Sequence, residues 1–183
     1  MSRSVPFAAA LMVLAALAAP ASAGVKLGAP APVLQGADLA GHEVDLAAEH
    51  GRVVIVSFWA TWCAPCRLEM PILNQSYLRH HAEGLDVIGV STDRPRNLAD
   101  VKRAMQDIRY PSLMAADAKQ NGFGTPRALP QTFVIDRQGV VRAVFGVLGQ
   151  PVTEAAIETT VSELLRDGAQ SGEGVMRSPR TEN

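Results

Sequence analysis

Residues 53–66 read VVIVSFWATWCAPC, an apolar run that leads into two tryptophans and two cysteines. The run from Val53 to Phe58 is apolar at nearly every position, as expected for a strand buried on both faces of a parallel or mixed sheet. Cys63 and Cys66 are the only cysteines of the chain, so the sequence offers no second disulfide. A Cys-x-x-Cys motif directly after such a strand is typical of a dithiol that cycles with its disulfide.

The two cysteines have different expected roles because a helix is predicted to begin between them. Free N–H groups and the positive end of the helix dipole favour a thiolate at Cys63. Since the thiolate is the attacking species in exchange, Cys63 is the predicted nucleophile and Cys66, one turn later, the resolving thiol. Pro65 suits the first helical turn, where its missing N–H costs no hydrogen bond. Arg67 adds positive charge, and Trp59 and Trp62 are expected to shield the site and pack against a partner.

Other uses of a Cys-x-x-Cys motif are less well supported. A structural zinc site needs a second pair of ligands, and the histidines lie in the preceding hairpin region or at the far end of the predicted helix. Covalent haem attachment needs histidine at the position of Arg67. A peroxidatic cysteine usually follows a threonine by three positions, where this chain has Ala60. A static structural disulfide is a further alternative, although a disulfide that closes a four-residue loop removes little conformational entropy from the unfolded chain. We therefore expect no bound metal or cofactor.

A second candidate site is the Leu129-Pro130 pair at the head of a predicted strand over 130–136. A proline after a small loop can be cis, because cis costs only about 0.5–1 kcal/mol before proline. Cis geometry would leave the Leu129 backbone free to pair with an extended substrate strand beside Cys63. A trans turn proline is the alternative, and these residues alone favour it.

The two ends of the chain differ from its middle. Residues 1–23 have the pattern of a secretory signal peptide, with a charged start at Arg3, an uncharged apolar segment over 7–19 and an A-x-A cleavage site over 21–23. An uncleaved N-terminal anchor is the alternative, although thirteen apolar residues are few for a hydrocarbon core of ~30 Å. Export would place the cysteine pair in the periplasm or another extracytoplasmic space, where disulfides persist. Residues 168–183 have little apolar content and predict a disordered tail.

Residues 24–167 predict one α/β domain with a mixed central sheet flanked by helices. A hairpin is expected over 33–46 and a Gly-rich turn over 120–125. Pro71 should kink the first of the helices. The formal net charge of −1 gives no indication of nucleic acid as a partner. The expected strands cover 53–58, 85–91, 112–115, 130–136 and 140–145, and the expected helices cover 63–83, 98–108 and 153–166.

These motifs, in this order, resemble the thioredoxin superfamily, and within it the exported TlpA/ResA/CcmG-like branch. The resemblance rests on residues 59–67, 69–71, 87–93 and 129–136 and covers about 28–166. It implies a thioredoxin fold with an additional N-terminal hairpin and a β-α insert near 86–115. It also implies Cys63 as nucleophile, Cys66 as resolving thiol and Pro130 as a cis-proline that faces the disulfide. Trp62, Pro65 and Leu129 would then contact the substrate.

One position departs from the thioredoxin pattern. Thioredoxin carries a buried aspartate six positions before its first cysteine, and this chain has Ser57 there. A serine hydroxyl cannot hold a proton near neutral pH as a carboxylate can, so proton transfer to Cys66 must take another route. Glu69, three residues past Cys66, is a candidate through a water molecule. The alternative is a glutamate that lies on the helix surface or pairs with a cap.

The resemblance implies an exported thiol-disulfide oxidoreductase whose redox group is the Cys63–Cys66 disulfide. It further implies a reductant of client proteins, such as apocytochrome c or the cysteines of copper sites. The alternatives are a broad oxidant that introduces disulfides and a non-enzymatic metal or haem chaperone on the same fold. The expected partners are client thiols or disulfides and an upstream membrane electron donor, and the protein is expected to be a monomer.

Overall fold

The computed structural model describes residues 25–147 and 149–173, with side chains up to residue 167. The predicted signal peptide and residues 174–183 of the predicted tail lie outside this range. Over the residues that are described, no helix combines the length and the apolar character needed to cross a membrane.

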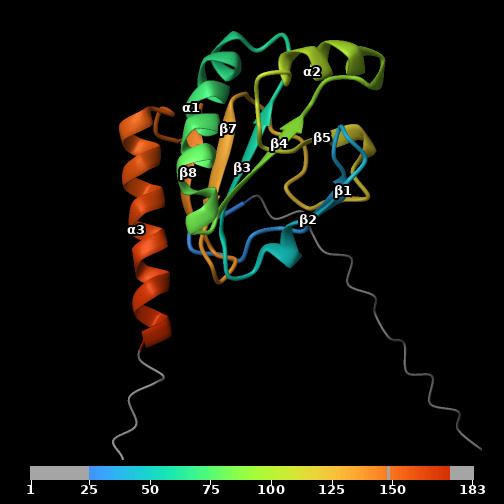
Figure 1. The fold of residues 1–183 in the computed structure, drawn as a ribbon. Helices are drawn as coiled ribbons and strands as arrows, with labels where there is room; N and C mark the ends of the chain where they lie inside the picture. Colours follow the sequence, from blue (N-terminus) through green and yellow to red (C-terminus); the bar gives the residue numbers. More distant parts are fainter. Residues whose placement is uncertain (1–24, 148, 174–183) are drawn as a thin grey trace, which may run out of the picture.

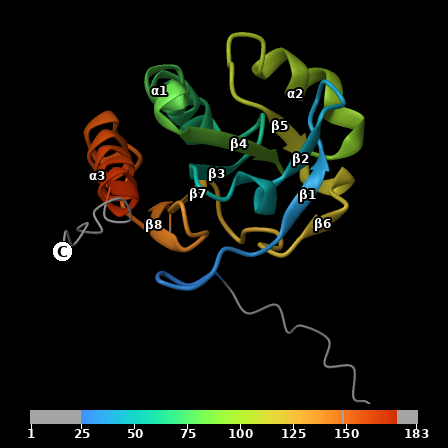
Figure 2. The same ribbon diagram turned by 60° about the horizontal axis from the view of Figure 1, so that its bottom comes forward.

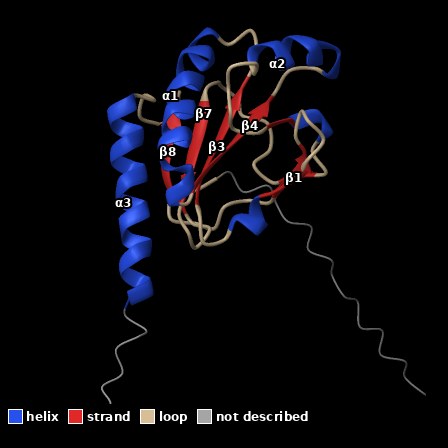
Figure 3. Ribbon diagram, viewed as in Figure 1, coloured by secondary structure: helices blue, strands red, loops and turns tan. Residues whose placement is uncertain are grey.

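A five-stranded mixed sheet with the order β5-β4-β3-β7-β8 forms the centre of the molecule (Figures 1 and 3). Strand β3 pairs in parallel with β4, and β4 in parallel with β5, whereas β7 runs antiparallel to both β3 and β8. Every residue of β3 is buried, as the apolar run predicts. The strand bounds, all close to the predicted ones, are β3 (Val53–Trp59), β4 (Leu85–Ser91), β5 (Ser112–Met114), β7 (Gln131–Ile135) and β8 (Val141–Gly146).

Three helices lie on one side of this sheet (Figure 2): α1 (Ala64–His80), α2 (Leu98–Ala104) and α3 (Glu154–Glu173). The chain steps from β3 to β4 to β5 in one direction, and right-handed crossovers then place α1 and α2 on the same face. On this face Val53 and Ile55 of β3 share a core cluster with Leu73 of α1 and Ile157 of α3. The helix α2 with β5 is the predicted β-α insert.

The opposite face is covered by a small antiparallel sheet with the order β2-β1-β6, made of β1 (Leu34–Ala37), β2 (Glu43–Asp45) and β6 (Gln120–Asn121). Strands β1 and β2 are the predicted hairpin. Strand β6 lies in the predicted Gly-rich turn, because pairing with β1 supplies backbone partners that the local sequence does not reveal. Leu34 and Val44 pack on this face against Val54, Val56 and Phe58 of β3. Short 3-10 helices connect the elements at Leu46–Glu49, His81–Glu83, Pro95–Asn97 and Ala115–Asp117.

Two helix ends differ from the predictions. Helix α2 ends at Ala104 rather than near Ile108, and α3 continues to Glu173 although its predicted end is Arg166. The predicted tail therefore begins in a helix. Gly168 costs about 1 kcal/mol relative to alanine in a helix interior, but the following Ala169 and Gln170 favour helix and no proline interrupts this stretch.

A buried histidine connects α1 to α3. His80 is 9% exposed, and its Nδ1 and Nε2 lie 2.9 Å from carboxylate oxygens of Glu83 and Glu158, respectively. Arg79 adds a second contact to Glu158 at 2.9 Å. Burial alone would lower the pKa of His80, but hydrogen bonds to the two carboxylates outweigh burial and raise this pKa above its usual value. The protonated imidazolium, which donates from both nitrogens, is the form that this arrangement stabilises.

We expect His80→Gln to reduce the free energy of unfolding in a pH-dependent manner. Because the folded-state pKa is raised, the stabilisation by His80 is present below its unfolded value of ~6.5 and is lost as pH rises through the folded value. Urea unfolding should give a difference on the order of 1 kcal/mol near about pH 6 and a smaller one near about pH 9. His50→Gln is the control, since His50 makes no ion pair among the residues described. Equal differences at the two pH values would contradict this assignment.

Candidate active site

The Cys63–Cys66 pair lies where the buried strand β3 passes into α1, and it is closed as a disulfide. Cys63 is the N-cap of α1, and its Sγ accepts a hydrogen bond from the Cys66 N–H at 3.3 Å. Pro65 occupies the first turn, as predicted. This turn, residues 64–67, contains no carboxylate that would offset the positive end of the helix dipole. The local field at Cys63 therefore favours a negatively charged sulfur.

The two tryptophans beside the pair have different environments. Trp59 is 1% exposed, packs in one core cluster with both cysteines, and donates through Nε1 to Ser112 Oγ at 3.2 Å. Trp62 is 69% exposed and stands in solvent next to Cys63. Trp62 is thus available to a partner, but the prediction of a partner contact is wrong for Trp59, which is buried in the core. The cysteines themselves are nearly covered, at 5% and 1% exposure.

The Leu129–Pro130 peptide bond is cis, which confirms the prediction. Leu129 packs against the cluster that contains Cys63 and Cys66, so the loop before β7 meets the disulfide. The carbonyl of Pro130 accepts a hydrogen bond from the Val147 N–H at 3.1 Å. Gly146 makes this approach possible, because it has a φ of +105° and an added Cβ would lie 2.1 Å from the Pro130 oxygen.

Ser57 forms a hydroxyl pair in place of a buried carboxylate. Its Oγ lies 2.9 Å from Thr132 Oγ1, and the two residues are opposite each other in the β3–β7 register. Both side chains are buried. Because each hydroxyl satisfies the other, this pair has neither a charge nor a titratable proton near neutral pH.

Glu69 is half-buried on α1, and its carboxyl is incompletely satisfied. Its Oε2 is shielded from solvent and has no hydrogen-bond partner among the described residues. Burial raises the pKa of Glu69 to about 7. The half-buried position differs from a fully exposed place on the helix surface, and the role of Glu69 in proton transfer stays a prediction. A carboxyl that titrates near neutral pH can both accept and return a proton, as the predicted role in proton transfer requires.

Asp93 is a buried carboxylate whose role the sequence alone did not indicate. It is 3% exposed and accepts hydrogen bonds from the Thr61 N–H at 2.8 Å, Thr61 Oγ1 at 2.7 Å and Ser91 Oγ at 2.9 Å. The N–H of Thr92 donates to the carbonyl of Trp59 at 2.9 Å. The end of β4 therefore holds the loop that carries Trp62 and Cys63. The available signal was an aspartate two residues after the end of a buried strand, where an unpaired charge is rare.

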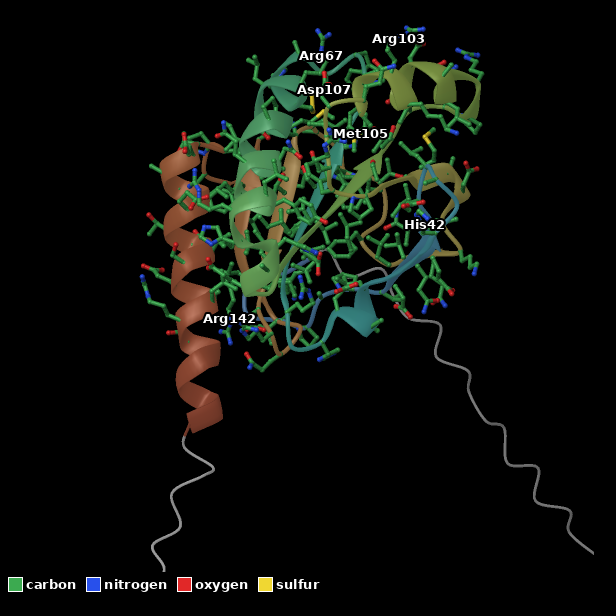
Figure 4. All side chains as sticks on the ribbon, in the orientation of Figure 1. His42, Arg67, Arg103, Met105, Asp107 and Arg142 are labelled. Atoms are coloured by element: carbon green, nitrogen blue, oxygen red, sulfur yellow. A yellow bond between two sulfur atoms is a disulfide. The ribbon has the colours of Figure 1, made fainter. Side chains whose placement is uncertain are left out.

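A hollow of about 420 Å³ opens beside Thr61, between α1 and α2. Met70 and Pro71 line it from α1, and Figure 4 shows Arg67, Arg103 and Asp107 at this end of the molecule. Met70 is 4% exposed and packs in the cluster of the cysteines. Over the part of the chain that is described, no group of three or more histidine, cysteine, aspartate or glutamate side chains is placed to hold a metal ion.

Comparison with known proteins agrees with this geometry. Residues 27–144 match the AhpC/TSA family. The chain belongs to the AhpC/TSA family. This family member is 30% identical over 123 residues to the thiol-disulfide oxidoreductase ResA of Bacillus cereus. The matched region covers 67% of this chain and 71% of the relative. It is 27% identical over 146 residues to ResA of Bacillus subtilis, and the match covers 79% of each chain.

Solved structures support the same assignment of this AhpC/TSA protein. A thiol:disulfide interchange protein of the thioredoxin family from Chlorobium tepidum superposes with a TM-score of 0.64 and 30% identity, covering 76% of this chain and 98% of that one. A secreted thiol-disulfide isomerase from Corynebacterium glutamicum superposes with a TM-score of 0.59 and is 28% identical in sequence. The superposition covers 74% of this chain and 84% of that one. The predicted thioredoxin fold and ResA-like resemblance are confirmed. With its Cys63–Cys66 disulfide, this family member is an oxidoreductase of thiols and disulfides.

We expect Cys63 rather than Cys66 to be the attacking thiol. Cys63 caps the helix and is the more exposed of the two cysteines, so it should be the more reactive after reduction. Brief alkylation of the reduced protein with iodoacetamide at mildly acidic pH, followed by peptide mass spectrometry, should label Cys63 first. Preferential labelling of Cys66 would reverse the assignment.

We expect Ser57→Ala to change the exchange rate by less than about tenfold, or about 1.4 kcal/mol in barrier. The reason is that the Ser57 hydroxyl is paired with Thr132 and carries no titratable proton near neutral pH. Thr132→Val is the matched variant, because it removes the other hydroxyl of the same pair. Stopped-flow reduction of a small disulfide measures both rates. A loss well beyond tenfold in Ser57→Ala would show that this hydroxyl orients a group needed for exchange.

Proposed function

We propose that the protein is an extracytoplasmic reductant of disulfides in client proteins. The observation that carries this proposal is a Cys-x-x-Cys disulfide at the N-terminus of α1, beside the cis bond of Leu129–Pro130. The direction of electron flow follows from the sequence resemblance to the TlpA/ResA/CcmG-like branch, and the similarity to ResA proteins supports that resemblance. A strong disulfide-forming oxidant would instead need a strongly stabilised reduced state.

The reaction proceeds by two successive exchanges. In the reduced protein the Cys63 thiolate attacks one sulfur of the client disulfide, which forms a mixed disulfide and releases the first client thiol. Cys66 then loses its proton and attacks the Cys63 sulfur, so that the second client thiol leaves and the Cys63–Cys66 disulfide closes. Two electrons and two protons pass from the dithiol to the client. An upstream membrane electron donor restores the dithiol.

The residues around the disulfide have complementary roles in this mechanism. Glu69, with its carboxyl that titrates near neutral pH, receives the Cys66 proton through a water molecule. The Leu129 backbone at the cis bond pairs with the extended client segment, and Trp62 and Pro65 contact its side chains. Pro130 keeps this edge of the backbone facing the disulfide. Apocytochrome c and the cysteines of copper sites are the client classes that the sequence resemblance suggests.

Export is supported by the pattern of residues 1–23 and by the similarity to a secreted isomerase. We propose that the mature chain begins at Gly24 and acts as a monomer. Intact-mass measurement of the exported protein tests the cleavage site. A mass that includes residues 1–23 would favour the anchored form.

The reduction potential tests the direction of electron flow. We expect a value between about −200 and −270 mV from equilibration with glutathione buffers, whereas a value near about −120 mV would indicate a disulfide-forming oxidant. Capture of clients with Cys66→Ser, which cannot resolve the mixed disulfide, identifies the partners. A copper chaperone is disfavoured because Met70, the methionine closest in sequence to the motif, is buried in the core.

We expect Glu69→Gln to slow closure of the mixed disulfide by about 10²-fold, because it removes a general base. In the wild type the rate should rise as pH increases through about 7, since the carboxylate form of Glu69 accepts the proton. The variant should lack this rise. Glu163→Gln is the control, because Glu163 is exposed on α3. Rapid-quench measurements of the closure rate across pH test this prediction. If Glu69→Gln keeps the pH profile of the wild type, Glu69 takes no part in proton transfer.

A further inference from the structure

Four exposed arginines lie on the segments that surround the Cys63–Cys66 disulfide: Arg67, Arg94, Arg96 and Arg127. Arg67 directly follows Cys66 in the first turn of α1, at the end of the molecule shown with this label in Figure 4. We call these four residues the arginine collar.

The other members of the arginine collar lie close in sequence to residues that contact the cysteine loop or the cluster of the cysteines. Arg94 and Arg96 follow Asp93, whose carboxylate holds Thr61 two residues before Cys63. Arg127 lies three residues before the cis bond, and the intervening loop brings Leu129 onto the cluster of the cysteines. Three segments far apart in the sequence therefore bring exposed arginines to the end of the sheet where the disulfide lies.

The arginine collar has no internal counter-charge. None of its four side chains forms an ion pair or hydrogen bond with any residue that the structure describes, whereas four other arginines pair with carboxylates: Arg52 with Asp86, Arg79 with Glu158, Arg103 with Asp100, and Arg142 with Asp136. The nearby carboxylates offset little of the positive charge of the collar. Asp93 is buried and already accepts three hydrogen bonds, and burial raises the pKa of Glu69 to about 7, so Glu69 is only partly charged. Asp100 and Asp107 line the same hollow as Arg67, but Asp100 is paired with Arg103 and neither forms an ion pair with Arg67.

The charge is distributed unevenly although the whole chain has a formal net charge of −1. Acidic side chains gather away from the disulfide, where Asp38, Glu43, Glu49 and Asp86 line one small cavity. Because unpaired charges of one sign around a site raise the local concentration of ligands of the opposite sign, this distribution affects which clients meet the disulfide.

We propose that the arginine collar selects client segments that carry aspartate or glutamate beside the reacting cysteines. This inference rests on the proposed exchange function and specifies its client class. A protein segment fits better than another anionic partner because exposed apolar side chains lie at the same end of the molecule. Trp62 and Val147 are 69% and 58% exposed, and Leu129 is partly buried against the cluster of the cysteines. An extended peptide can place apolar side chains on these residues and carboxylates on the guanidinium groups of the collar.

The expected effect is on the rate of encounter, and it depends on salt. Exposed charges steer association without adding much to the affinity of the docked complex, and ions screen them over about 8 Å at physiological ionic strength. The collar should therefore distinguish acidic from basic clients at low salt and lose this distinction at high salt.

Single-turnover reduction of three synthetic cyclic peptides tests the proposal. The peptides share one disulfide ring and differ only in flanking residues, which are glutamate, glutamine or lysine. In each turnover the Cys63/Cys66 dithiol passes two electrons and two protons to the peptide disulfide, and chromatography of the quenched mixture measures the peptide dithiol. We expect the glutamate peptide to react about tenfold faster than the lysine peptide near about 20 mM salt, and less than about twofold faster near about 0.5 M.

Charge-matched variants locate the effect. Arg94→Gln/Arg127→Gln should lower the ratio of the two rates to about threefold or less at low salt. Lys26→Gln/Arg166→Gln removes the same charge far from the disulfide and should retain the wild-type ratio. Lys26 lies close to the start of β8, since the Gly28 N–H donates to Val141 at 2.8 Å, and Arg166 is exposed in the last part of α3.

The outcomes separate this inference from the proposed function. Equal rates for all three peptides in the wild type would overturn selection by the collar and leave the exchange function intact. Failure to reduce any peptide would instead contradict the exchange function. An equal loss of the ratio in both double variants would overturn the assignment to the collar. If the wild type sediments with anionic phospholipid vesicles, Arg94→Gln/Arg127→Gln does not, and the peptides react equally, the collar serves a lipid surface and the proposal is wrong.

Discussion

The site depends on the central position of β3, which pairs with β4 along one edge and with β7 along the other. Since β3 and β4 are parallel and β7 is antiparallel, the ends of β3 and β4 and the start of β7 meet at one end of the sheet. In the register, Trp59 lies opposite Ser91, and Phe58 lies opposite Gln131. The cysteine loop, the Asp93 turn and the cis-proline loop are thereby brought together, and no single segment could form the site alone.

Two partly buried ionisable groups on α1 show how packing decides protonation. His80 loses solvation but gains a carboxylate on each ring nitrogen, so its charged form is favoured. Glu69 also loses solvation, but one of its oxygens has no partner among the residues described, so its neutral form is favoured. The same helix therefore holds one group that ties it to α3 and another that can exchange a proton near neutral pH. The presence or absence of hydrogen-bonding partners, rather than burial itself, therefore decides which form each group favours: the charged form of His80 and the neutral form of Glu69.

Much of this arrangement could be predicted from the sequence, because the determining signals are local. The apolar run of β3, the hairpin before it and the Cys-x-x-Cys motif at a helix start each need only neighbouring residues to be recognised. The cis bond at Pro130 could be expected from the family resemblance, although the local residues favoured trans. Asp93 and strand β6 were missed because their partners, Thr61 and β1, lie far away in the sequence. The burial of Glu69 likewise depends on neighbours that α1 meets only in the folded chain.

The different environments of the two tryptophans have an optical consequence. A disulfide quenches a nearby excited indole by accepting an electron, and Trp59 packs in one cluster with Cys63 and Cys66. Trp62, the other tryptophan of the chain, stands in solvent next to Cys63 and should emit at longer wavelength than Trp59. Reduction should therefore increase the emission of both tryptophans, whereas a partner docked on Trp62 should shift only the long-wavelength part of the spectrum. Redox state would then be reported by the intensity of emission, and occupancy by its wavelength.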